Sequence, residues 1–257
     1  MSQKLHGTAI EAFWSGTSFL ITSTVFQPNF ASLSDIFGRR SLILVALVFF
    51  TIGAIVAAIA NNFTVILVGR SIQGVGGGGI ISLAEITVTD IVPLRERGKY
   101  FSFLSTMWAI GSVGGPLIGG VFVQEVSWRW IFWVNLPFCA IGFVLIPLFL
   151  NLNHRTTSFL EKLGRVDWIG SVIFVGSTMS LLIPVTWGGV MYPWDHWRTV
   201  VPLVLGVVGL AGFVLYERFL AREPLIRLGV FSTRTAVVNY LGTVMHGLIV
   251  CLELDEG

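Results

Sequence analysis

A stretch of 23 residues without a charged side chain, Phe101–Val123, constrains the fold of this chain more than any other feature. Its middle part, Gly111–Gly120, is rich in glycine, and in water it would form a loop because glycine weakens helices. About 20 apolar residues are nevertheless enough to cross a bilayer as a helix, and a lone segment in lipid can satisfy its backbone hydrogen bonds only as a helix. The sequence therefore predicts a membrane helix with Gly111, Gly115 and Gly119 on one face, where a neighbouring helix can approach closely.

The composition is that of a membrane protein. Hydrophobic residues make up 54% of the chain and charged residues 12%, with a mean hydropathy of +0.82, whereas a soluble domain carries about 25% charged residues. The net charge of +2 and the lack of a basic cluster among exposed aromatics argue against a nucleic-acid partner. Cys139 and Cys251 lie in apolar stretches, so we interpret them as core or lipid-facing residues and not as a disulfide or metal pair.

The hydropathy pattern predicts an all-α, polytopic membrane helix bundle with about seven or eight transmembrane helices. The candidate spans are, in chain order, Phe13–Leu33, Leu42–Ala60, Phe63–Ala84, Phe101–Val123, Ile131–Leu150, Trp168–Trp187, Val200–Tyr216 and Ala236–Leu252. The first span carries Gln27, Pro28 and Asn29 and is the least apolar, so we expect it to face the interior of the bundle. The last span is short and marginal.

The basic residues predict the orientation of the spans. Twelve of the sixteen Lys and Arg residues follow odd-numbered spans, while Lys4, Arg129 and Arg198 lie on the other side and Arg70 lies within a span. Because cytoplasmic loops are rich in Lys and Arg, we expect the odd-numbered spans to end in the cytoplasm and the amino terminus to lie outside. This parity predicts a further helix before Glu11.

The turn between the first two spans concentrates charge. Asp35 ends the first span, and Arg39 and Arg40 begin the second. A carboxylate and two guanidinium groups in a tight turn can bind helix ends or charges of a neighbouring helix, and Glu85 and Asp90 at the end of the third span are candidate partners. The alternative is a solvated turn that carries only the basic charge expected of a cytoplasmic loop.

Arg70 and Gln73 lie about two turns into the third span. An arginine at that depth is expected to face a cavity or a partner and is a functional candidate, although it can also extend towards the nearer interface. The glycines that follow, Gly74–Gly79, satisfy the dinucleotide-binding pattern G-x-G-x-x-G. That pattern requires a preceding strand, and here it lies inside an apolar helical stretch.

The sequence supports neither an enzyme nor a metal site. The four histidines have no metal-ligand spacing, and no phosphate-binding loop, Ser/His/Asp arrangement or H-E-x-x-H pattern occurs. Asn62 begins a glycosylation sequon in a loop so short that its use stays open.

Taken together, four motifs resemble the major facilitator superfamily, and within it the fourteen-spanner drug:proton antiporters of fungal type. They cover the chain to about His246 and are Asp35-x-x-Gly38-Arg39-Arg40, Arg70-x-x-Gln73-Gly74, Gly111-x-x-x-Gly115-Pro116-x-x-Gly119-Gly120 and the segment Trp128–Pro137. Ala31 departs from the family pattern, which usually has glycine at that position.

The resemblance implies a division of the chain into three parts. Residues 1–150 would be a partial amino-terminal transporter half with family helices two to six. Residues 151–234 would hold two extra central helices and cytoplasmic linkers, and residues 235–257 the start of the second half. The first family helix and most of the second half would be missing.

The resemblance also implies roles for the motif residues. Asp35, Gly38, Arg39 and Arg40, with Asp90, would form a latch that holds the outward-facing state.

Arg70 and Gln73 would belong to proton coupling. The helix with Gly111, Gly115, Pro116, Gly119 and Gly120 would seal the interface between the two halves.

The implied function is proton-coupled efflux of small lipophilic molecules such as drugs, toxins or secondary metabolites. The proton gradient would supply the energy without a cofactor, and the partners would be the lipid bilayer, a small-molecule substrate and the missing half. The expected location is the plasma membrane. We expect the 257-residue chain by itself not to transport. The alternatives are a non-transporting membrane remnant or assembly partner and, with less support, a membrane-embedded enzyme.

Overall fold

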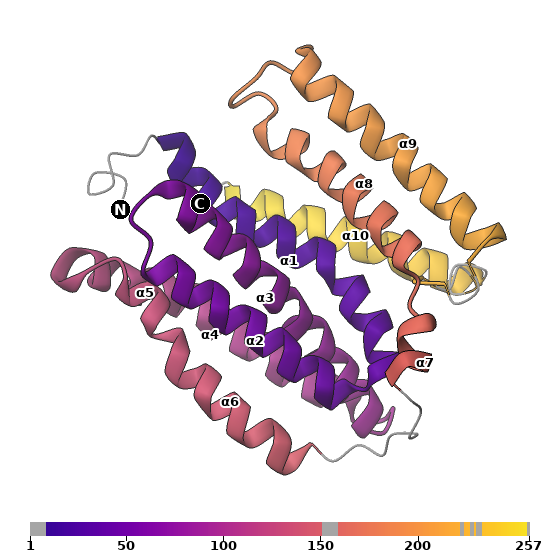
Figure 1. The fold of residues 1–257 in the computed structure, drawn as a ribbon, viewed down its shortest axis with the longest axis horizontal. Helices are drawn as coiled ribbons and strands as arrows, with labels where there is room; N and C mark the ends of the chain where they lie inside the picture. The colour runs from indigo at the N-terminus through magenta and orange to yellow at the C-terminus, as the bar shows by residue number, and fades with distance from the viewer. Residues whose placement is uncertain (1–8, 151–158, 222–223, 227–228, 230–232, 256–257) are drawn as a thin grey trace.

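The computed structural model describes residues 9–150, 159–221, 224–226, 229 and 233–255, and in these residues the regular secondary structure is helical. Figure 1 shows the long helices lying side by side. In chain order the helices are α1 (Ala9–Phe37), α2 (Arg39–Ala58), α3 (Phe63–Ile91), α4 (Arg97–Val121), the π-helix η2 (Phe122–Val126), α5 (Trp130–Trp133), α6 (Asn135–Phe149), α7 (Phe159–Gly164), α8 (Trp168–Trp187), α9 (Trp197–Phe219) and α10 (Arg234–Asp255). The all-α fold class is therefore confirmed.

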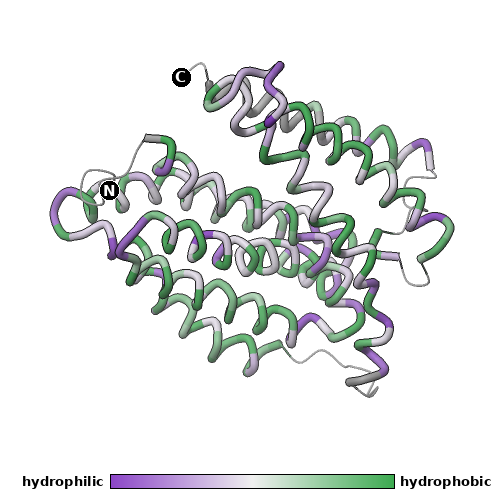
Figure 2. Tube along the Cα trace, turned by 45° about the horizontal axis from the view of Figure 1, so that its top comes forward, coloured by the Kyte–Doolittle hydropathy of each residue, from purple (hydrophilic) through white to green (hydrophobic). Residues whose placement is uncertain are grey.

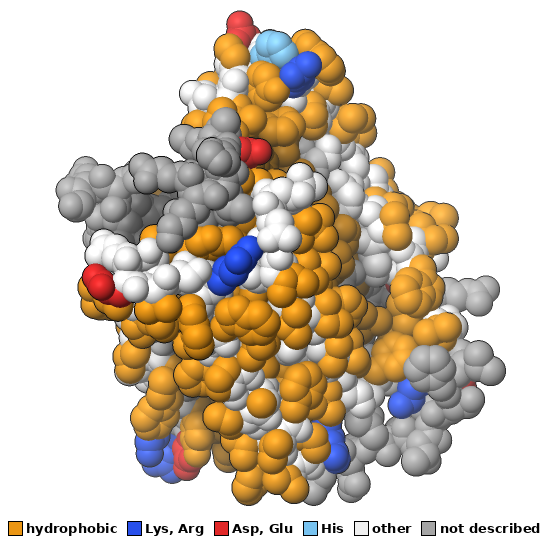
Figure 3. Space-filling view, turned by 60° about the vertical axis from the view of Figure 1, so that its left-hand side comes forward, with side chains coloured by type: hydrophobic (Ala, Val, Ile, Leu, Met, Phe, Trp, Pro, Cys, Tyr) orange, Lys and Arg blue, Asp and Glu red, His pale blue; other side chains and the backbone are white. Residues whose placement is uncertain are grey.

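Helices occupy all eight positions that the hydropathy pattern predicts. Within the described residues, six are long and apolar enough to cross a membrane, namely α2, α3, α4 with η2, α5 with α6, α8 and α9. Much of the hydrophilic colour in Figure 2 lies at turns and helix ends. Figure 3 shows a face on which hydrophobic side chains predominate and charged groups are few, as expected of a surface in contact with lipid.

The first helix lies inside the bundle, as its polar residues predict. α1 packs along α3 and also contacts α2 and α8. Its Thr22, Ser23 and Asn29 are buried together with the apolar Val25 and Phe30. Thr22 donates to the carbonyl of Ser18 at 2.7 Å, so this hydroxyl is satisfied within its own helix and can be buried at little cost.

The predicted fifth span is two helices instead of one. A turn at Val134 separates α5 from α6. Pro137 lies in the first turn of α6 and has no N–H to continue the hydrogen bonds of α5. The Nδ2 of Asn135 donates instead to the carbonyl of Ile131, at 3.1 Å, and holds the two pieces together.

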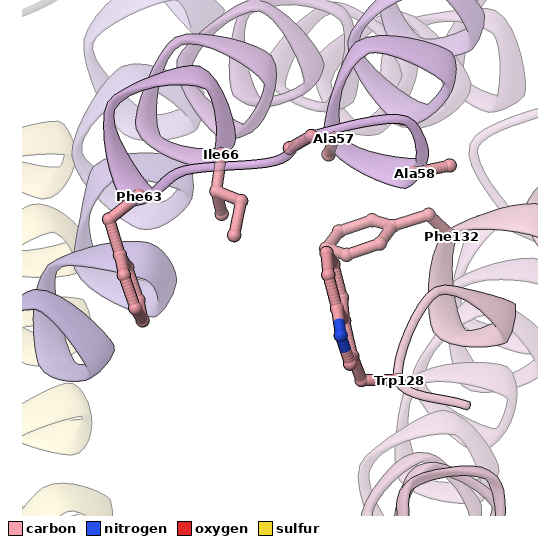
Figure 4. Packing of buried hydrophobic residues seen from close by; sticks show 7 residues of the cluster. Ala57, Ala58, Phe63, Ile66, Trp128 and Phe132 are labelled. Carbon is pink, nitrogen blue, oxygen red and sulfur yellow. The ribbon is translucent and has the colours of Figure 1, made fainter. Parts of the chain in front are cut away.

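An apolar cluster closes the end of the bundle where α2 turns into α3. Figure 4 shows Trp128 and Phe132 reaching under this turn towards Ala57, Phe63 and Ile66. The rings of Trp128 and Phe132 meet edge to face, with centroids 6.2 Å apart, an arrangement favoured by aromatic quadrupoles.

Arg129 ties the same end together with polar contacts. Its Nη2 donates to the carbonyl of Ala60 and to the side-chain oxygen of Asn61, both at 3.0 Å. Asn62 caps α3, because its side chain accepts from the N–H of Val65 at 2.9 Å.

The helices α8 and α9 form a separate packed pair. Ser180 donates to the carbonyl of Pro202 at 2.8 Å, and the rings of Phe174 and Phe213 lie 5.2 Å apart. Where α8 begins and α9 ends, the hydroxyl of Tyr216 donates to the carboxylate of Asp167 at 2.9 Å. This pair matches the two helices that the resemblance places between the transporter halves, although that assignment stays a prediction.

Candidate functional site

A sharp turn at Gly38 brings the charges of the first loop together. Gly38 joins α1 to α2 with a φ of 97°, a left-handed conformation that glycine adopts without the steric cost of a side chain. Gly38 is therefore the single residue between the end of α1 at Phe37 and the start of α2 at Arg39. The guanidinium of Arg39 points back over the end of α1, where Asp35 and Ser34 lie.

Arg39 links three helix ends. Its Nη1 lies 2.6 Å from Oδ1 of Asp35 and also donates to the hydroxyl of Ser34. Its Nε donates to Oδ2 of Asp90, near the end of α3, at 2.9 Å. Of the partners considered from the sequence, the structure joins Asp90 to Arg39. The arrangement fits a latch, but that role stays a prediction.

Arg97 begins α4 directly after the α3–α4 turn, and the sequence predicts for it only the basic charge of a cytoplasmic loop. Arg97 donates from Nη2 to the carbonyl of Thr89 at 2.7 Å and from Nε to the carbonyl of Val92 at 3.2 Å. Carbonyls at the end of a helix lack intrahelical partners, and a cation there also interacts favourably with the helix dipole. Its position shortly after the end of a long span was the available signal.

The side chain of Arg70 extends from α3 towards α1. Its Nε donates to the backbone carbonyl of Ser15 at 2.9 Å, and its Nη1 donates to the side-chain oxygen of Gln73 at 2.8 Å. The guanidinium carbon lies 4.5 Å from the ring centroid of Phe19 and 6.0 Å from that of Phe132, within the range of cation–π attraction. These contacts are all with uncharged groups, and within the described residues the half-buried guanidinium forms no ion pair with a carboxylate.

The sequence named Arg70 and Gln73 together without predicting a contact, and the structure shows that they touch because residues three apart on a helix share a face. The sequence did not identify Ser15 as the other partner, because a backbone carbonyl has no sequence signature. That carbonyl can accept from Arg70 because a carbonyl oxygen has two lone pairs, of which a helical hydrogen bond uses only one.

The glycine face of α4 is open. A Cβ built on Gly111, Gly115, Gly119 or Gly120 would have no neighbour within 4 Å. The helix continues through Pro116 without interruption, and none of its residues is buried. The predicted helix is therefore confirmed, while the described residues provide no helix that packs against its glycine face. The sealing role stays a prediction.

The described residues hold no group of three His, Cys, Asp or Glu side chains that could bind a metal ion together. Cys139 is free and buried. The side chain of Cys251 lies outside the described part of the structure, so the expectation for it is untested.

These features define a multi-pass integral membrane protein whose first three helices form a closely packed unit with charged side chains at one end. Residues 1–252 match the sequence profile of the Major Facilitator Superfamily. The chain belongs to this family.

Fungal transporters are among the similar proteins. The chain is 61% identical to MFS transporter L2 of a Phoma species over 249 residues, and these residues make up 97% of this chain and 42% of the relative. It is 41% identical over 238 residues to the efflux pump FUS6 of Gibberella fujikuroi, covering 92% and 43%. It is 42% identical over 238 residues to the acurin A biosynthesis cluster MFS-type transporter of Aspergillus aculeatus, covering 92% and 43%. The chain thus spans less than half the length of these relatives.

Proposed function

We propose that this chain forms part of a proton-coupled efflux transporter for small lipophilic molecules. The observation that carries the proposal is the combination of a closely packed unit, α1–α3, with the open glycine face of α4. Secondary transporters work by moving one helix bundle against another around a site between them. Such a mechanism needs a unit that keeps its shape and a face on which a second bundle can close.

The relatives favour efflux as the direction and secondary metabolites as a substrate class. One is named an efflux pump and another is named for the acurin A biosynthesis cluster. A producer of a lipophilic metabolite needs a path to export it. We infer the same substrate class here, with drugs and toxins of similar character.

The other expected properties belong to the same proposal. The protein acts as a transporter and not as an enzyme, its partners are the bilayer, a small molecule and a second helix bundle, and its membrane is the plasma membrane. Arg70 fits a role in proton coupling because its charge is not neutralised by its described contacts. It is available to attract a carboxylate or an anionic group that enters from the second bundle.

The test is a chimera in which residues 1–257 replace the matching part of the Phoma relative. Inside-out membrane vesicles with an acidic lumen should accumulate a lipophilic fluorescent dye, and a protonophore should abolish the accumulation. Arg70→Gln should lower the initial rate at least about fivefold. This factor corresponds to about 1 kcal/mol, the lower end of typical coupling free energies between two sites. Arg95→Gln, which changes an exposed arginine of the α3–α4 turn, is the matched control.

Two outcomes would contradict the proposal. Dye accumulation that survives the protonophore would exclude proton coupling. A folded chimera that moves no dye, beside an active parent, would instead support a non-transporting membrane protein. The 257-residue chain by itself should be inactive in the same vesicles, because the moving second bundle is needed.

A further inference from the structure

A groove lies between α1, α2 and α8. It consists of two adjoining cavities of about 450 and 540 Å³, which share Leu33, Leu42, Val45 and Trp168 as walls. Because these walls are shared, the two cavities adjoin, and we call them together the α1–α8 groove. Each cavity falls within the usual range of about 300–1,000 Å³ for ligand sites.

The larger cavity of the groove is apolar. It runs past aromatic and aliphatic side chains of α1, α2, α3 and α8, and Asn29 and Ser171 are the polar side chains in its lining. Gly176 of α8 also lines it, and a Cβ on this glycine would meet nothing within 4 Å. Such a space suits a flexible hydrocarbon chain, since no buried charge would need a partner.

The smaller cavity has one charged residue in its lining. Lys162 of α7 lines it together with the polar Ser41, and no described residue forms an ion pair with Lys162. Its neighbour Glu161 is exposed and lines neither cavity. In Figure 1, α7 lies beside the end of α1 and the start of α2, so the cavity that Lys162 lines forms the end of the groove at this turn.

This end of the groove belongs to the side that the basic loops assign to the cytoplasm. The cytoplasmic leaflet carries the anionic lipids, and basic pockets between transmembrane helices on this side suit their headgroups. Trp168 lines both cavities, in keeping with the preference of tryptophan for the interface between headgroups and hydrocarbon.

We propose that the α1–α8 groove binds one anionic phospholipid of the cytoplasmic leaflet. Lys162 attracts the phosphate and its anionic headgroup, Ser41 donates a hydrogen bond to the phosphate, and an acyl chain fills the larger, apolar cavity as far as Gly176. The charge at one end and the apolar cavity match the two parts of such a lipid. A lipophilic transport substrate without an anion would leave Lys162 unused.

The experiment compares phosphatidylserine with phosphatidylcholine of the same acyl chains. Native mass spectrometry of the full 257-residue chain in detergent measures the affinity for each. The unmodified chain should bind phosphatidylserine about fivefold more tightly, because a basic residue at the membrane surface contributes roughly a factor of this size. Lys162→Gln should abolish the preference, while Lys99→Gln, at an exposed lysine of α4, should keep it.

A second pair of variants tests the apolar part of the groove. Gly176→Leu should weaken the binding of both lipids, because leucine would occupy the space of the acyl chain. Gly212→Leu in α9 is the matched control, since a Cβ there also meets no neighbour and Gly212 lines neither cavity. Equal affinities for the two lipids, a preference that survives Lys162→Gln, or unchanged binding after Gly176→Leu would overturn the proposal.

Discussion

Two glycine-rich segments of this protein have similar composition and opposite surroundings. In Gly74–Gly79 of α3, a Cβ on Gly76 would lie 2.3 Å from the nitrogen of Phe50, and one on Gly78 would lie 2.2 Å from the carbonyl oxygen of Ser23. These contacts are with the backbones of α2 and α1. In Gly111–Gly120 of α4, a Cβ on any of the glycines would meet nothing within 4 Å.

The difference shows what glycine contributes to a membrane helix. It lowers helix propensity wherever it occurs, and it compensates only where another backbone uses the space. The α3 glycines let α1 and α2 approach on two sides, so they hold the three-helix unit together. The α4 glycines leave a smooth surface whose contact, if it forms, lies with something other than the described residues.

The largest effect is expected at Gly76. In Gly76→Val the new side chain would collide with the backbone of α2, since the carbonyl oxygen of Ala46 is 2.4 Å and the nitrogen of Phe50 2.3 Å from the Cβ position. Overpacking of this kind costs about 1–3 kcal/mol and occasionally more, and backbone cannot move aside as a side chain can. The apparent midpoint of thermal unfolding in detergent should fall, and the yield of monodisperse protein should drop.

The matched control for Gly76 is Gly16→Val in α1, where a Cβ meets nothing within 4 Å. It should leave the thermal midpoint close to that of the unmodified chain. Equal losses in the two variants would show that helix propensity, and not close packing, explains the glycines of α3.

A smaller effect is expected where Arg39 joins the end of α3. The carboxylate of Asp90 is 39% exposed and that of Asp35 is 59% exposed, so water and salt screen both pairs. Asp90→Asn should lower the free energy of unfolding by about 1 kcal/mol or less. A double-mutant cycle with Arg39→Gln should give a positive coupling free energy that declines as salt is added.

Coupling that is absent at low salt would mean that the Arg39–Asp90 contact does not stabilise the unit. Glu85→Gln serves as the control, because Glu85 lies exposed on the same helix. Its combination with Arg39→Gln should be additive.

The smallest effect is expected on the glycine face of α4. The double variant Gly115→Val with Gly119→Val adds two side chains to open space, so the free energy of unfolding of this chain should change by no more than about 0.5 kcal/mol. In the chimera with the Phoma relative, the same variant should reduce transport if a second bundle closes on this face. A large loss of stability in the chain itself would show that α4 is packed more closely than the structure indicates.

The sequence by itself determined the helices and their class. Long apolar stretches in lipid can satisfy their backbones only as helices, so the position of each span follows from local composition. The contact between Arg70 and Gln73 also follows from local sequence, because residues three apart lie on one face of a helix. The break at Val134 was not predicted from hydropathy, because it depends on Pro137, which has no N–H to donate in the first turn of α6.

Only the tertiary structure decided which surfaces meet. The choice of Asp90 for Arg39, of the Ser15 carbonyl for Arg70, and of α3 over α4 for close packing depends on how the helices are rotated and shifted against one another. Hydropathy contains little information on these two quantities, because every face of such a helix is apolar enough for either lipid or protein. The Gly111–Gly120 segment could thus be recognised as a helix from its residues, but its open face could not.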